Sequence, residues 1–231
     1  MTLLLFQEVL DTLNVTEGLT SPELVEEIRL WELIQKGGLT MLVLFLLFSF
    51  SVYVFVERIN ILRKAKQEPG TLLNKVKEAV LAGDVNRAKV ACDQHQTPMA
   101  KMLISGLSHI GSSLKNIEAA IENVGRLEIY KLEKNISVLG TISGAAPMIG
   151  FFGTVIGMIK AFIAISQNEG SVSPKLLSSG IYEAMITTAG GLFVGILAYV
   201  AYNYLVRQVS DVVHNMEVTT IEFIDLLQRP N

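Results

Sequence analysis

The sequence predicts an all-helical integral membrane protein with three membrane-spanning segments. Half of the 231 residues are hydrophobic and 18% are charged, whereas a typical soluble domain is about 25% charged. The mean hydropathy of +0.44 comes from apolar residues gathered in long blocks. Three of these blocks reach the roughly 17–25 residues that a helix needs to cross a bilayer.

The predicted spans share an almost uninterrupted apolar composition; they are residues 39–56, 136–166 and 176–206. The second span contains one charged residue, Lys160, and the third contains one, Glu183. The segments before, between and after the spans are residues 1–38, 57–135, 167–175 and 207–231. Residues 1–10 lack a basic region and a cleavage site, so no cleaved signal peptide is expected.

The distribution of charge predicts the orientation. Residues 1–38 carry two basic and seven acidic residues, whereas residues 57–135 carry thirteen basic and nine acidic residues. Basic residues concentrate in cytoplasmic segments, and the clearest cluster follows the first span directly, at Arg58, Arg63, Lys64 and Lys66. We therefore expect the N-terminus and the short loop outside the cytoplasm, a cytoplasmic segment 57–135 and a cytoplasmic C-terminus.

Capping residues predict helices outside the spans. Ser21 followed by Pro22 is typical of a helix start, and this helix either lies on the outer membrane interface or packs within an outer domain. In the cytoplasmic segment, helices are expected over residues 71–82 and 85–92 and from Thr97-Pro98 onward. Breaks are expected at Gly83-Asp84 and at residues 111–113.

Two very long helices are expected next, because no loop signal separates the second and third spans from their cytoplasmic neighbours. Residues 113–166 and 176–228 would each form one helix of about 54 and 53 residues, roughly 80 Å long. The hydrocarbon core of a bilayer is only about 30 Å thick. Both helices should therefore extend about 50 Å into the cytoplasm.

Polar residues inside the spans are the candidate functional groups. In an antiparallel hairpin turning near residue 171, Lys160 and Glu183 fall at equal depth, as do Thr154 and Thr188. An ionisable residue in a span is usually functional or paired. Glu183 could face a wet cavity, pair with Lys160 or reach toward the surface, and the hydroxyls of Thr154, Thr187 and Thr188 could simply bond the backbone one turn back.

Small residues predict close helix packing in the second and third spans. Without a hydrophobic driving force in lipid, small side chains let helices approach closely. The candidates for such packing are Gly140, Gly144, Pro147, Gly150, Gly153 and Gly157 in the second span and Gly191 and Gly195 in the third.

The composition also argues against several classes of protein. A net charge of −3 offers no basic surface for nucleic acid. One cysteine and three scattered histidines make no metal site, and no phosphate-binding loop, dinucleotide motif or catalytic triad is visible. We expect neither an enzyme nor a cofactor.

Two motifs resemble those of the MotA/TolQ/ExbB proton-channel family. They are APMIGFFGTVIGMI at residues 146–159 and GIYEAMITTAGGL at residues 180–192, and Glu57-Arg58 matches a third family feature. Three spans resemble the ExbB/TolQ branch. The resemblance implies a homopentamer in the bacterial inner membrane, with the second and third spans lining a pore that holds single-span helices of an ExbD/TolR-type partner.

The resemblance also implies roles for particular residues. Thr154, Glu183 and Thr188 fall on the family's polar pore positions, and Thr187 is grouped with them as a candidate for the proton pathway. The partner would carry the proton-binding aspartate, which fits a chain whose spans hold a single carboxylate. The implied function is a proton-driven motor for work at the outer membrane, most naturally TonB-dependent transport with a TonB-type protein as a further partner. A Tol-type or gliding-motility system and a non-conducting membrane scaffold are the alternatives.

Overall fold

The computed structural model describes residues 38–66, 69–167 and 174–228. These residues form helices joined by short turns, without a β-strand among them. The helices are α3 (Gly38–Ala65), α4 (Pro69–Leu81), α5 (Val85–Asp93), α6 (Pro98–Ser108), α7 (Leu114–Glu133), α8 (Ile136–Gln167) and α9 (Pro174–Gln228). The predicted interfacial helix after Ser21-Pro22 lies outside the described residues, as does most of the predicted loop 167–175.

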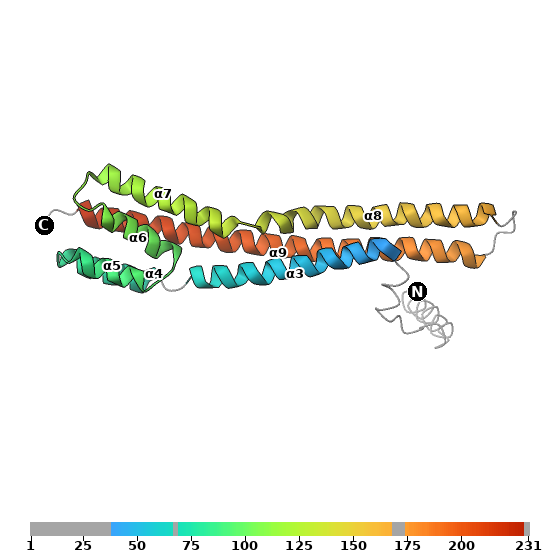
Figure 1. Cartoon of the computed structure of the whole chain (residues 1–231), viewed down its shortest axis with the longest axis horizontal. Coiled ribbons are helices and arrows are strands. Elements are labelled where there is room, and N and C mark those ends of the chain that lie inside the picture. Colours follow the sequence, from blue (N-terminus) through green and yellow to red (C-terminus); the bar gives the residue numbers. More distant parts are fainter. Residues whose placement is uncertain (1–37, 67–68, 168–173, 229–231) are drawn as a thin grey trace, which may run out of the picture.

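The described helices form a long rod with α9 as its spine (Figure 1). At about 1.5 Å per residue, the 55 residues of α9 span roughly 80 Å. Helices α3 and α8 lie along one half of α9, and α4 to α7 gather around the other half (Figure 1). The single long helix predicted over residues 176–228 is therefore confirmed.

Three long helical segments are apolar enough to cross a membrane, which confirms the all-helical class and the number of candidate spans in the described part of the chain. In their most apolar stretches at most 33% of the residues are buried. The exposed residues include Phe45, Phe151 and Phe193. Apolar surface of this extent calls for lipid or other protein to cover it, so the chain is a multi-pass membrane protein.

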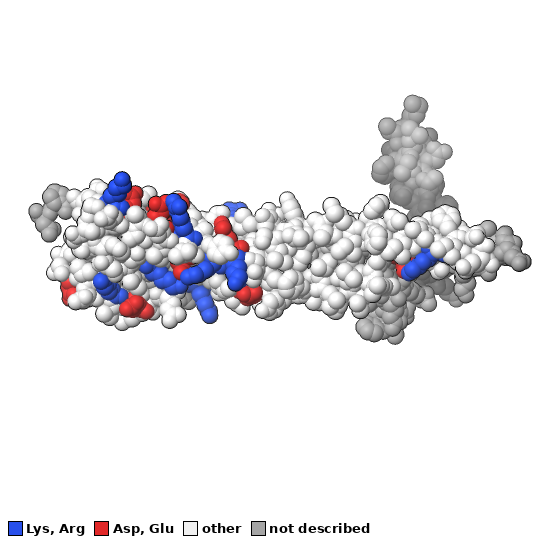
Figure 2. Space-filling view, turned by 45° about the horizontal axis from the view of Figure 1, so that its top comes forward, with Lys and Arg blue, Asp and Glu red and all other residues white. Residues whose placement is uncertain are grey.

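Charged side chains occupy the opposite half of the rod. Figure 2 shows Lys, Arg, Asp and Glu gathered over the half that holds α4 to α7, while the other half is almost entirely free of them. The larger hydrophobic core lies in the charged half and joins α4 to α7 with the ends of α3 and α9, around Leu103 and Phe223. A smaller core, which includes Leu44, Ala146 and Val194, joins the three long helices in the apolar half.

Local capping sets the ends of the short helices. Asp84 accepts a hydrogen bond from the backbone N–H of Arg87 at 2.9 Å, and Thr97 accepts one from Ala100 at 3.3 Å. Both side chains satisfy an amide that would otherwise have no partner in the first helical turn. Gly83 precedes the first cap with φ +75°, a left-handed conformation that glycine adopts without strain.

The predicted continuous helix over residues 113–166 is wrong at one point. Helix α7 ends at Glu133 and α8 begins at Ile136, with Lys134 extended at ψ 136° and Asn135 left-handed at φ 64°. Asparagine tolerates this conformation better than other side-chain-bearing residues. Together with Lys131 and Lys134 it forms a recognisable helix end that the apolar pattern obscured.

Arg58 stabilises this break from the neighbouring helix α3. Its guanidinium is buried and donates to the carbonyl oxygen of Lys131 at 3.2 Å, one of the last carbonyls of α7. It also pairs with Glu57 at 3.3 Å, while its Nε has no hydrogen-bond partner among the described residues. A cation is favoured at a helix C-terminus because the carbonyls there carry a partial negative charge.

Candidate functional site

Helices α8 and α9 touch backbone to backbone through glycines. A Cβ atom placed on Gly191 would lie 2.6 Å from the carbonyl oxygen of Ala146 and 2.8 Å from Cα of Gly150. A Cβ on Gly150 would in turn lie 2.8 Å from the carbonyl oxygen of Thr187. Any side chain larger than hydrogen would push these two helices apart.

The close contact continues toward both ends of the helix pair. A Cβ on Gly153 would lie 2.6 Å from Oγ1 of Thr187, and one on Gly157 would lie 3.1 Å from the carbonyl oxygen of Gly180. Toward the charged half, a Cβ on Gly195 would lie 2.6 Å from Cγ of Pro147.

The two remaining glycines of the predicted packing set behave differently. A Cβ on Gly140 would meet the ring of Tyr202 at 3.3 Å, a contact with a side chain instead of the backbone. A Cβ on Gly144 would have no atom within 4 Å among the described residues, so Gly144 takes no part in the α8–α9 contact.

The three threonines occupy different places along this contact. Thr187 is fully buried against Gly153 and donates its hydroxyl to the carbonyl oxygen of Ala184 at 2.9 Å. Thr188 reaches across to α8 and donates to the carbonyl oxygen of Gly150 at 3.4 Å. Thr154 donates to its own helix, at Phe151, and makes no bond with Thr188 although the two lie at similar depth.

Lys160 and Glu183 form an ion pair between the two spans. The Nζ atom of Lys160 lies 2.7 Å from Oε1 of Glu183, with side-chain exposures of 57% and 20%. The same carboxylate oxygen would lie 2.9 Å from a Cβ on Gly38, the first residue of α3. Glu183 therefore lies between the ammonium group of Lys160 and the N-terminal end of α3.

The structure thus brings Glu183 together with Lys160 and places Thr187 one turn further along α9, about 6 Å away along the helix axis. It keeps Thr154 on the other helix, on a surface that is only partly covered. The described spans hold hydroxyls and one ion pair, and the described residues contain no cluster of three or more His, Cys, Asp or Glu that could hold a metal.

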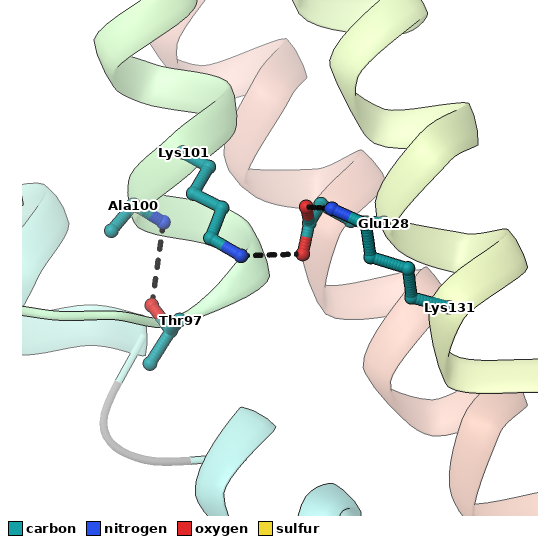
Figure 3. Close-up of polar contacts among 5 residues, drawn as sticks. All are labelled: Thr97, Ala100, Lys101, Glu128 and Lys131. Atoms are coloured by element: carbon teal, nitrogen blue, oxygen red, sulfur yellow. Dashed lines mark hydrogen bonds and ion pairs between the residues drawn. The ribbon is translucent and has the colours of Figure 1, made fainter.

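A second polar cluster lies in the charged half and was not anticipated from the sequence. Glu128 is buried and accepts hydrogen bonds from Lys101 of α6 at 2.9 Å and Lys131 of α7 at 2.6 Å (Figure 3). Burial alone would raise the pKa of Glu128, but these two hydrogen bonds and the positive charges behind them bring it below its usual value. The sequence held one signal that Glu128 is buried, since Glu128 lies in helical register with Ile121 and Leu132 on the apolar stripe of α7.

Cys92 is a buried core residue. Burial and the nearby charge of Asp93 raise the pKa of its thiol to about 11. A thiol with such a pKa stays protonated and unreactive near neutral pH, which agrees with a role in packing.

These features define a multi-pass helical membrane protein whose tightly packed second and third long helices enclose a few polar groups. Residues 94–218, which contain Thr154, Lys160, Glu183, Thr187 and Thr188, match the model of the MotA/TolQ/ExbB proton channel family. The chain belongs to this family, which is a family of proton channels and not of enzymes.

Relatives of both named types resemble the chain. An ExbB homolog of Methanothermobacter thermautotrophicus, a biopolymer transport protein, is 29% identical over 81% of this chain and 66% of its own length. The Tol-Pal system protein TolQ of Haemophilus influenzae is 29% identical over 88% of this chain and 95% of its own length. The biopolymer transport protein ExbB of Neisseria gonorrhoeae is 43% identical, over 33% of this chain and 34% of its own. These relatives support the ExbB/TolQ branch.

Proposed function

We propose that the chain is the channel-forming subunit of a proton-driven motor in the bacterial inner membrane. It would assemble as a homopentamer whose pore is lined by α8 and α9, with single-span helices of an ExbD/TolR-type partner inside. Thr154, Thr187, Thr188 and Glu183 would form this chain's share of the proton pathway. The motor would power work at the outer membrane, with TonB-dependent transport and a TonB-type protein as first candidates.

The observation that carries the proposal is the placement of the polar groups. Lys160 and Glu183 are the only charged residues in the described spans, and they lie with three threonine hydroxyls on the two helices that are packed by glycine contacts. Placing ionisable groups in a bilayer costs roughly 2.5–3.5 kcal/mol each on insertion scales. A scaffold that conducts nothing has no use for ionisable groups in the bilayer, whereas a proton channel requires them.

The ion pair indicates how the work is divided between this chain and its partner. Because Glu183 is engaged by Lys160, it would help to order the pore wall instead of carrying the proton itself. The proton carried through the pore would then bind an acid supplied by the partner. Helix α9 would place Thr187 and Thr188 one turn further along the path. Thr187 is fully buried against Gly153, whereas Thr188 is partly exposed and its hydroxyl oxygen keeps a lone pair for water or a proton.

The proposed orientation places the N-terminus and the loop between α8 and α9 in the periplasm. The basic cluster after the first span and the excess of basic residues over residues 57–135 support a cytoplasmic location for α4 to α7. The ends of α8 and α9 in the charged half of the rod would then project into the cytoplasm, together with α7.

A Tol-type system is the second candidate for the work performed. The alignment with TolQ of Haemophilus influenzae extends over nearly the whole length of both chains, whereas the ExbB relative with the highest identity reported above aligns over a third. Complementation of strains that lack either system would separate the two roles, because each strain reports on one outer-membrane process.

Proton flux into liposomes tests the proposal. The chain is reconstituted with its single-span partner, and flux is compared for wild type, Glu183→Gln and Thr188→Val, with the subunit count of each checked by native mass spectrometry. Ser49→Ala is the matched control, because Ser49 donates its hydroxyl to Phe45 on α3, away from the α8–α9 contact. We expect a ring of five in every case, with flux lost in the first two variants and retained in the control.

Two results would contradict the proposal. A wild-type complex that conducts no protons under a membrane potential would favour the scaffold alternative. A monomer or dimer without a central partner helix would remove the pore on which the proton pathway depends.

A further inference from the structure

A groove of about 550 Å³ runs between α3 and α9, in the part of the apolar half of the rod nearest the charged helices. Its walls come from residues between Phe48 and Ile59 on α3 and between Leu197 and Tyr204 on α9. The rings of Phe55 and Tyr204 meet edge to face across it, with centroids 6.2 Å apart. The walls are apolar apart from two hydroxyl groups, those of Ser51 and Tyr204.

The dimensions of this α3–α9 groove match one leaflet of a bilayer. From Phe48 to Ile59 the α3 wall is about 16 Å long, roughly half of the 30 Å hydrocarbon core. Its rim is open to the outside, since Val52 and Val200 are 45% and 60% exposed. The volume lies within the range of pockets that hold small molecules.

Two arginines stand at the end of the groove nearest the charged helices. Helices α3 and α9 run in the same direction (Figure 1), and the ion pair of Lys66 with Asp211 at 3.1 Å fixes their register. In this register Arg63 and Arg207 lie at the same level. Arg63 lies four residues after Ile59, the last groove residue of α3, and Arg207 lies three residues after Tyr204, the last groove residue of α9. Residues three or four apart share one face of a helix, so both arginines project from the groove side.

Neither arginine makes an ion pair with any residue that the structure describes, and both are exposed. Lys66, the nearest lysine on the same side of α3, is already paired with Asp211. An arginine binds a phosphate group through two parallel hydrogen bonds. Two unpaired arginines at the mouth of an apolar groove therefore complement a molecule with a phosphate at one end and a hydrocarbon chain at the other.

We infer that the α3–α9 groove binds an anionic phospholipid of the cytoplasmic leaflet, with an acyl chain along Phe55 and Tyr204 and the headgroup phosphate at Arg63 and Arg207. The inference rests on the membrane orientation given under the proposed function, but not on proton conduction. A bound lipid would fill the space between the first span and α9 and would tie α3 to the helix that carries Glu183.

Native mass spectrometry of the full-length, detergent-purified protein tests this site. The protein is delipidated and mixed with equal amounts of phosphatidylglycerol and phosphatidylcholine that carry the same acyl chains. We expect wild type to retain phosphatidylglycerol preferentially. In Arg63→Gln/Arg207→Gln the preference should fall about 25-fold, since one interfacial basic residue changes affinity for anionic lipid about fivefold.

Lys64→Gln is the matched control, because Lys64 lies beside Arg63 in the chain but about 100° further round α3. It removes one positive charge at the same depth as Arg63 but away from the groove, so the preference should fall at most about fivefold, well short of the loss in the double variant. Equal loss of preference in Lys64→Gln and the double variant would show general charge attraction and overturn the inference. Unchanged preference in the double variant would overturn it as well.

A third variant tests the groove itself without changing a charge. Val200→Trp fills the rim and should reduce retention of both lipids. A second copy of the chain is the competing occupant, and Val200→Cys detects it with a thiol cross-linker, since Cys92 is buried. Cross-linking of two copies through this position would show that protein covers the groove and would overturn the inference. All of these measurements are independent of proton flux, so failure of the channel proposal would not be mistaken for failure of the lipid site.

Discussion

Replacing Gly191 with alanine tests how tightly α8 and α9 are packed. The added Cβ would lie 2.6 Å from the carbonyl oxygen of Ala146, whereas ordinary contact begins at 3.4 Å. The helices would have to separate locally by about 0.8 Å, in an interior that is packed as densely as a crystal. Overpacking of this kind typically costs 1–3 kcal/mol, because the atom on the other side is backbone and cannot rotate away.

Gly144→Ala provides the matched comparison. Gly144 lies on α8, the other helix of the same pair, but a Cβ there would have no atom within 4 Å. Both substitutions gain the same intrinsic helix propensity, about 1 kcal/mol, so the difference between them isolates the packing cost. Gly144→Ala should be neutral or stabilising, and Gly191→Ala should be about 1–3 kcal/mol less stable than Gly144→Ala.

Thermal unfolding of the purified protein in detergent, followed by circular dichroism, measures this difference. For a chain of this size 1 kcal/mol shifts the midpoint by about 2–4 °C. Gly191→Ala should therefore unfold about 2–12 °C below Gly144→Ala. Equal midpoints for the two variants would refute the argument that backbone contact at Gly191 holds these helices together.

Three further predictions concern Glu128, Asn135 and Cys92. Glu128→Gln should weaken the pH dependence of stability. Because folding lowers the pKa of Glu128 from 4.5, its contribution to the free energy of unfolding is complete above pH 4.5 and is lost as the pH falls through the lower pKa of the folded state. Unfolding midpoints measured from about pH 6 down to pH 3 should fall more steeply for wild type than for the variant. Asn135→Ala should lower the free energy of unfolding by about 1 kcal/mol, since alanine resists φ 64°, whereas Asn135→Gly should not. The thiol of Cys92 should react with a maleimide at about pH 8 only after unfolding, and rapid labelling of the native protein would contradict the raised pKa.

Local sequence signals predicted much of the fold. The caps at Asp84 and Thr97 are hydrogen bonds between neighbours in the chain, so they could be inferred from residue type and spacing alone. The apolar blocks gave the number of spans for a similar reason, since a bilayer requires a fixed length of apolar helix. The break at Asn135 was missed because its signal, made of Lys131, Lys134 and Asn135, is short and lies beside a strong apolar pattern.

At the candidate site, local sequence signals predicted the depth of the polar residues but not their contacts. Equal depth of Lys160 and Glu183 followed from counting residues around the loop, but depth does not say which way a helix faces. The same counting paired Thr154 with Thr188, and there the structure instead has Thr188 bonded to Gly150 and Thr154 to its own helix. The rotation of each helix about its axis decides between these outcomes, and that rotation is set by the glycine contacts between α8 and α9.

By itself, then, the sequence determined the helical class, the three apolar spans and the residues that carry the family motifs. Only the tertiary structure decided that Lys160 holds Glu183, that Arg58 reaches the last carbonyls of α7 and that Glu128 lies between two lysines. The physical reason is the range of the interactions. Caps and spans depend on residues within a few turns of one helix, whereas these ionic contacts join side chains brought together by the packing of separate helices or by the precise rotation of one helix against another.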